Sequence, residues 1–139
     1  MGLDMSFYSA HPDMIERRTD CPPEINFNDH TAYENYEDYC KLHEIAYFRK
    51  HNRLHGWLMK LYYSKGGKGS FNGDALEITL DDVRHLKCAI KNDNMDDVSG
   101  FFWGTQRFDR SIKKQYNQLC RKIRRAIKDG LVVYYNSSW

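Results

Sequence analysis

The chain has 139 residues, a formal net charge of +2 and 14% aromatic residues, including ten tyrosines and three tryptophans. This length suits one domain over residues 1–139 with a single core, and the aromatic content excludes a disordered chain. Apolar runs such as Leu131–Tyr135 are too short to cross a bilayer, and the first residues lack the basic-then-apolar pattern of a signal peptide. We therefore expect a folded cytoplasmic protein with no membrane partner.

Three stretches are predicted in the first half of the chain. Leu3–Tyr8 alternates enough between apolar and polar residues to form a strand. His11–His30 contains Pro22 and Pro23, which exclude a regular helix, so we expect an irregular connection. A helix is predicted from about Cys40 to Tyr63, because its apolar residues recur at helical spacing.

Three polar residues, Arg49, Asn52 and His55, follow one another along this predicted helix. Burying an amide or an imidazole without partners costs about 1–3 kcal/mol each, so their positions need a reason. They either form a buried network that joins the helix to the sheet, or they face a pocket. In a pocket, the guanidinium would bind a phosphate or carboxylate, the amide would donate and accept, and the imidazole would supply a proton near neutral pH.

The middle of the chain contains a loop, a short strand and a helix. The glycine-rich run Ser64–Ser70 lacks the spacing of a phosphate-binding P-loop, so we expect a plain flexible turn. Ala75–Thr79 is predicted to be a strand, and Thr79–Asp82 is typical of an acidic helix start. This second helix should end near Asn92.

The last third of the chain gives the clearest pattern. A third helix is predicted to end at Gly130, and Leu131–Tyr135 should be a central strand because it is apolar on both faces. The predicted fold is therefore α+β, with a sheet of two to three strands, including the N-terminal and C-terminal strands, packed against three helices. The apolar stripe of the third helix comprises Ile112, Tyr116, Leu119, Cys120, Ile123 and Ile127.

The charge is distributed asymmetrically along the chain. Asp13–Glu44 holds nine acidic and three basic residues, whereas Arg107–Lys128 holds nine basic residues and only one acidic residue. A basic face on the third helix either binds phosphates, with help from an exposed Trp103, or is a solvated surface that docks the acidic stretch. The candidate nucleic-acid-binding residues are Lys113, Lys114, Arg121, Arg124 and Arg125.

Neither a disulfide framework nor a metal site is expected. The four cysteines are widely spaced without a C-x-x-C pair, so buried free thiols are the simpler interpretation. Cys40, His43, His51 and His55 lie near one another in sequence but lack both the Glu of H-E-x-x-H and a second pair of ligands. We expect no metal and no cofactor.

Four motifs carry a resemblance to a known family. They are Gly2–Met5, Phe48–Trp57, Ser99–Gly104 and Tyr134–Trp139. In this order they resemble the patterns GLDM, WRKxNxIHxW, SGFFFG and YYxSSW of a family of small uncharacterised phage and prophage proteins. The match spans nearly the whole chain. It departs from the family in the third helix, which is acidic in the family pattern and basic here.

The resemblance implies one ligand-binding group drawn from all four motifs. Trp103 joins this group because three consecutive aromatic residues cannot all point into one core, although the run could equally form a plug at the end of the sheet. Trp139 is open to two similar interpretations, as part of the site or as a lid over the core. The implied residues are Asp4, Arg49, Lys50, Asn52, His55, Ser99, Gly100, Gly104, Ser137, Ser138 and Trp139.

Three functional classes follow from these patterns. The favoured one is a phage-type accessory protein that binds a host protein or an anionic small molecule such as a nucleotide, and so inhibits a host process such as antiviral defence. The second is a small enzyme acting on a phosphorylated substrate, and the third is a nucleic-acid-binding protein. No nucleophile–base pair stands out in the sequence, which favours binding over turnover. A phage-encoded protein would act in the host cytoplasm, and the aromatic residues would also suit a homo-oligomer.

Overall fold

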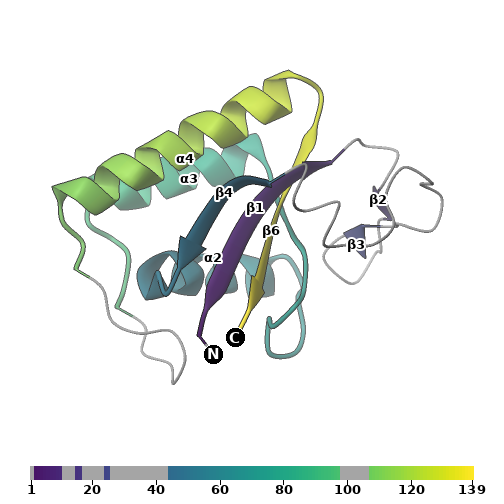
Figure 1. Cartoon of the computed structure of the whole chain (residues 1–139), viewed down its shortest axis with the longest axis horizontal. Helices are drawn as coiled ribbons and strands as arrows, with labels where there is room; N and C mark the ends of the chain where they lie inside the picture. The colour runs from purple at the N-terminus through teal and green to yellow at the C-terminus, as the bar shows by residue number, and fades with distance from the viewer. Residues whose placement is uncertain (1, 11–14, 17–23, 26–43, 98–106) are drawn as a thin grey trace.

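The central sheet pairs the two ends of the chain with each other. The computed structural model describes residues 2–10, 15–16, 24–25, 44–97 and 107–139. Within these ranges four antiparallel strands follow the order β4–β1–β6–β5, so the N-terminal and C-terminal strands form the inner pair. The two ends of the chain consequently lie side by side (Figure 1). The strands are β1 (Asp4–Ala10), β4 (Glu44–Arg49), β5 (Leu76–Ile78) and β6 (Val132–Ser138).

Three helices lie against one face of this sheet. In Figure 1, α3 and α4 run side by side behind one end of the strands and α2 lies behind the other end. None of the helices in the described ranges has the length and apolarity needed to cross a bilayer. Two short strands, β2 (Ile15–Glu16) and β3 (Glu24–Ile25), form a separate pair. The helices are α2 (Asn52–Ser64), α3 (Leu80–Lys91) and α4 (Arg110–Lys128).

The alternation along β1 separates a core face from a polar face. Met5 and Phe7 are fully buried in the core cluster, whereas Asp4 and Ser6, which alternate with them, are partly exposed on the other side. This alternation ends at Phe7, because the last three residues of β1 are all buried. The helices contribute buried residues such as Leu58, Leu86, Leu119 and Ile123 to the same core. The predicted α+β class is therefore confirmed, with four strands in the main sheet instead of two or three.

The first part of the helix predicted from Cys40 to Tyr63 is wrong. Glu44–Arg49 is a strand that pairs with β1, and α2 begins only at Asn52. Ile45, Tyr47 and Phe48 are residue types that suit a half-buried strand, and their spacing matched a helix only by coincidence. Lys50 has a positive φ of 58°, which turns the chain between the two elements. Residues 40–43 lie outside the described residues, as does most of the predicted irregular connection His11–His30. The described parts of that connection are regular, because they form the paired strands β2 and β3.

The other predicted elements are confirmed, with local reasons for their ends. At the start of α3, the Thr79 hydroxyl accepts a hydrogen bond from the backbone N–H of Asp82 at 3.2 Å. The Asp82 carboxylate accepts one in return from the N–H of Thr79 at 2.8 Å, which completes a capping box. Asp109 caps α4 through the N–H of Ile112, and Gly130 follows the helix with a φ of 84°. β6 is central, as predicted.

The left-handed conformation of Lys50 leads to a first prediction. Lys50→Val should lower the free energy of unfolding by about 1–2 kcal/mol, because a β-branched residue is strained at positive φ. Lys50→Gly removes the same exposed side chain without that strain and should cost little or nothing. Urea denaturation of both variants measures the difference. Equal losses in the two variants would show that the lysine side chain, and not the backbone conformation, determines stability here.

Candidate functional site

The predicted ligand-binding group is divided between the two faces of the sheet. Asp4 on β1 lies opposite Arg49 on β4 and opposite Ser138 on β6, so these three residues form one row across three strands. The row lies on the polar face, at the end of the strands where the two chain ends meet, and we call it the polar edge of the sheet. Lys50 follows directly, and its backbone N–H donates to the carbonyl of Leu3 at 2.8 Å. The structure thus brings four of the predicted residues together.

Arg49 has a carboxylate beside it at this edge. Its Nε lies 3.9 Å from Oδ1 of Asp4, and both side chains are about half exposed. The hydroxyl of Tyr47, which is 51% exposed, donates to the same oxygen, and this hydrogen bond raises the pKa of Tyr47. Because Asp4 partly neutralises the guanidinium, this row attracts an anion less strongly than an unpaired arginine would.

Asn52 connects α2 to the segment that follows α3. It is fully buried at the first position of α2, and its amide nitrogen donates to the carboxylate of Asp97. The neighbouring Arg53 donates to the carbonyl oxygen of Met95 at 2.6 Å. These contacts form a polar network, but it joins α2 to the segment after α3 and not, as the network interpretation expected, to the sheet.

His55 lies in the core among aromatic rings. It is fully buried, and its Nδ1 shares a hydrogen bond of 2.7 Å with the hydroxyl of Tyr135. Its ring stacks on Phe71 at a centroid distance of 5.5 Å and packs edge-to-face with Trp139 at a centroid distance of 6.5 Å. Burial lowers the pKa of His55 to about 4, so the ring is neutral at pH 7.

The C-terminal residues also pack inward. The Ser137 hydroxyl donates to the carbonyl of Phe71 at 3.3 Å. Trp139 packs against the core, and its backbone exchanges two hydrogen bonds with the side chain of Asn72, at 3.2 and 2.7 Å. Of the two interpretations of Trp139, this position corresponds to the lid over the core. The remaining predicted residues, Ser99, Gly100, Trp103 and Gly104, lie outside the described residues.

The expected helical row of Arg49, Asn52 and His55 is therefore wrong. Arg49 belongs to a strand and points to the polar face, whereas Asn52 and His55 are buried on the helix side. Arg49 and the two buried residues of α2 are spaced in the sequence as on one helix. The turn at Lys50, which separates Arg49 from them, is not visible in the sequence.

The neutral His55 gives a second prediction. An unfolded histidine titrates near pH 6.5, so below that pH the unfolded chain binds a proton that the folded chain binds only near pH 4. As the pH drops from about 6.5 to about 4, the free energy of unfolding should consequently fall by about 1.4 kcal/mol for each pH unit. The half-buried His51 adds a loss of the same sign, because burial lowers its pKa as well.

Urea denaturation at several pH values measures this loss. His55→Gln should flatten the pH dependence of the free energy of unfolding relative to the wild type. An unchanged slope in His55→Gln would contradict the assigned pKa.

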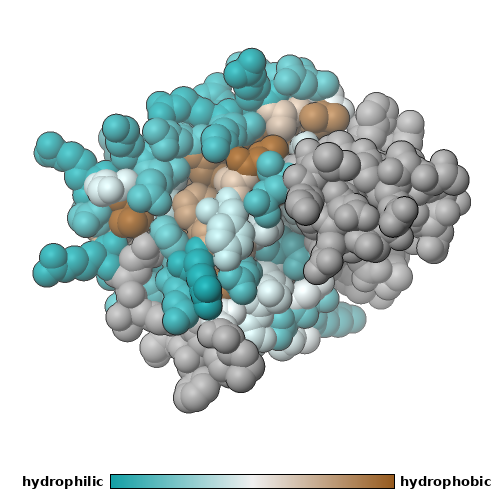
Figure 2. All heavy atoms as spheres, in the orientation of Figure 1, coloured by the Kyte–Doolittle hydropathy of each residue, from teal (hydrophilic) through white to brown (hydrophobic). Residues whose placement is uncertain are grey.

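The exposed face of α4 is strongly basic. This helix of 19 residues contains eight basic and no acidic residues. Its buried stripe, which includes Tyr116, Leu119 and Ile123, lies on the side opposite the cations. Figure 2 shows a hydrophilic surface along α4. The predicted helix and its amphipathic pattern are thus both confirmed.

Four cations of α4 gather around one surface hollow of about 300 Å³. They are Arg121, Arg124, Arg125 and Lys128, and all four are exposed. None of them forms an ion pair with another residue in the described ranges. We call these four residues the basic cluster. Lys128 is not among the predicted nucleic-acid-binding residues, although its place three residues after Arg125 on the same face indicates it.

The two other predicted phosphate-binding residues differ from each other. Lys114 is exposed on the same face. Lys113 is partly buried, forms an ion pair with Asp93, and places its ammonium group 5.3 Å from the centre of the Phe108 ring. Lys113 is therefore held in place by the fold more firmly than the basic cluster is.

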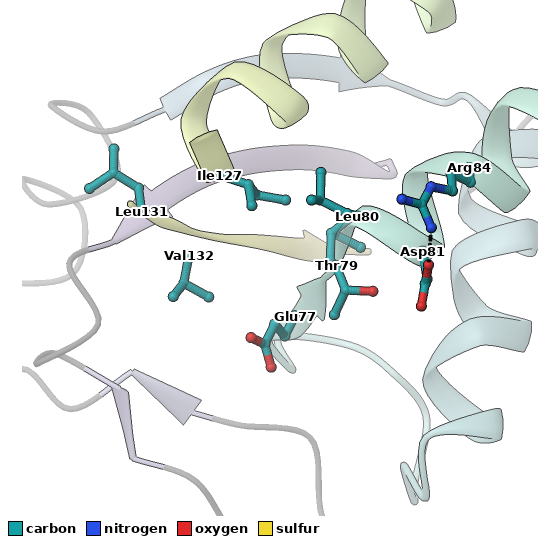
Figure 3. Close-up of a pocket in the computed structure, with 9 residues that line it drawn as sticks. Glu77, Thr79, Leu80, Asp81, Arg84, Ile127, Leu131 and Val132 are labelled. Carbon is teal, nitrogen blue, oxygen red and sulfur yellow. Dashed lines mark hydrogen bonds and ion pairs between the residues drawn. The ribbon is translucent and has the colours of Figure 1, made fainter. Parts of the chain in front are cut away.

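A larger hollow, of about 450 Å³, lies between α3, α4 and β6 and was not expected from the sequence. Figure 3 shows Ile127 and Leu80 pointing toward each other across it, near Leu131. Asp81 and Arg84 form an ion pair of 2.7 Å at its rim. This lining is mainly apolar and also includes Glu77, Ile78 and Thr79 from β5 and the residue after it. Within the described residues, no three His, Cys, Asp or Glu side chains are placed to hold a metal ion.

Comparison with known proteins adds no further constraint on this site. The chain matches no protein-family model, no curated protein and no solved structure.

Proposed function

We propose that this protein binds the phosphate backbone of nucleic acid through the basic face of α4. The observation that carries this proposal is the basic cluster, in which four exposed cations line one hollow and no described carboxylate pairs with them. Phosphate groups are the natural counterions for such a surface, and binding through them is independent of base sequence.

The length of the basic face suits an extended polyanion. Arg110 and Lys128 lie at the two ends of α4, and a helical rise of 1.5 Å per residue separates them by about 27 Å. This distance corresponds to about eight base pairs along a duplex. A small anion would need only one end of such a face, whereas a nucleic-acid backbone would contact all of it.

The cost of the arrangement also supports a binding role. Like charges three and four residues apart on a helix destabilise it by about 0.2–0.5 kcal/mol per pair. The helix dipole favours the cations of the last turn, Arg125 and Lys128, but it does not explain Arg121 or Lys114 further from that end. A helix serving only the core would be more stable with acidic residues among these positions.

The polar edge of the sheet supports a second candidate function. Asp4, Arg49 and Ser138 lie in one row there beside the half-exposed Tyr47. This edge suits a host protein or a small anionic molecule. Together with the resemblance to phage and prophage proteins, it supports a phage-type accessory role that inhibits a host process such as antiviral defence. Asp4 partly neutralises Arg49, so we rank this edge below the basic face.

The small-enzyme alternative receives less support. Its proposed acid or base, His55, is fully buried, and at pH 7 it is neutral. Arg49, the proposed anion-binding residue, lies on the other face of the sheet. A single substrate could not contact both side chains without opening the core.

A charge-neutralising variant tests the proposed function. Arg121→Gln with Arg125→Gln should weaken binding of a short labelled oligonucleotide by about tenfold or more at low salt, because two phosphate contacts are lost. The slope of log affinity against log salt should decrease by about 1.5–2 for the same reason. Fluorescence anisotropy at several salt concentrations measures both quantities.

The matched control removes the same charge elsewhere. Lys60→Gln with Lys68→Gln changes two exposed lysines away from α4 and should keep most of the affinity. Equal losses of affinity in both double variants would show that only the net charge of the protein matters, and would refute the basic face as the binding site. Thermal unfolding separates a third outcome. A clear loss of stability in the α4 variant would mean that these cations dock the chain's own acidic stretch, residues 13–44.

A further inference from the structure

We propose that a second hollow, between α3 and α4, holds one unstacked nucleotide, so that single-stranded nucleic acid is the preferred ligand. This inference rests on the proposed function and specifies its ligand. The hollow has a volume of about 350 Å³, within the range of small-molecule sites. Its lining residues are Lys87, Cys88, Ile90 and Lys91 of α3, and Lys113 and Asn117 of α4.

The hollow continues the basic face. α3 and α4 are antiparallel neighbours, because Lys91 near the end of α3 shares this hollow with Lys113 near the start of α4. Asn117 precedes Arg121 by one helical turn on the same face of α4. A single strand of nucleic acid that crosses the basic cluster can therefore reach the hollow while it stays in contact with the two helices.

The walls offer both kinds of surface that a nucleotide needs. Ile90 is 1% exposed and belongs to the core, and the lysine stems add further apolar surface against which a base can lie. The Asn117 amide can donate to and accept from the edge of that base. A fatty acid would leave this amide unused, and inorganic phosphate would leave the apolar wall unused.

The charge around the hollow favours a phosphate. Lys87 and Lys91 are exposed, lie one helical turn apart, and form no ion pair with any residue that the structure describes. Lys113 already pairs with Asp93, so that carboxylate is compensated. Two lysines consequently remain for the phosphate of the nucleotide whose base lies in the hollow.

Cys88 provides a probe in the wall of the hollow. Free buried thiols were expected from the sequence, and Cys120 is indeed buried, but Cys88 is exposed. Burial raises the pKa of Cys120 to about 11, so that thiol should react slowly and serve as an internal reference. Alkylation followed at the level of single peptides distinguishes the two from the other cysteines.

The test compares a short single-stranded oligonucleotide with an abasic strand of the same number of phosphates. The proposed function requires both strands to bind. The further inference requires the normal strand to bind about tenfold more tightly, because stacking one base contributes about that factor. It also requires the normal strand, and not the abasic one at saturation, to slow alkylation of Cys88.

A variant that fills the hollow completes the test. Cys88→Trp should reduce binding of the normal strand to the level of the abasic strand, whereas His85→Trp, at an exposed position of α3 outside the hollow, should not. Equal affinity of both strands for the wild type, with Cys88 unprotected, would overturn the inference and leave the proposed function intact. Failure of both strands to bind would refute the proposed function itself. If Cys88→Trp does not fold, the relative affinity of the two strands and the protection of Cys88 in the wild type still test the inference.

Discussion

Burial of the apolar stripe of α4 fixes both the core and the charged surface of this protein. Tyr116, Leu119 and Ile123 can leave water only if the opposite side of the helix faces outward, and that side holds the cations. The hydrophobic contacts with α3 and the sheet thus offset the mutual repulsion of the basic residues. The repulsion between the basic residues destabilises α4, and the burial of its apolar stripe in the core stabilises it.

The pairing of the two chain ends has a similar double effect. Because β1 and β6 form the inner pair of the sheet, Asp4 and Ser138 meet on the polar face while Trp139 packs over the core beside His55. Residues of one sequence motif therefore point in opposite directions. Of the ligand-binding residues that the resemblance implies, some are therefore buried in the core and others lie exposed at the polar edge of the sheet.

The sequence predicts those elements whose apolar period is long or whose ends are capped. The stripe of α4 and the acidic helix start Thr79–Asp82 identify the two later helices directly. Glu44–Arg49 is too short for such a signal, and the turn at Lys50 depends on a left-handed lysine that no residue type announces. The hollows could not be predicted, because each needs the packing of separate elements, such as Lys91 against Lys113.

The central claim is that α4 and its neighbour α3 contact nucleic acid. Titration of ¹⁵N-labelled protein with a short single-stranded oligonucleotide, followed by two-dimensional NMR, tests it most directly. The account predicts that the largest amide shifts occur over residues 121–128 and 87–91, with little change at the polar edge of the sheet. Shifts that concentrate at Asp4, Tyr47 and Arg49, with α4 unaffected, would contradict it.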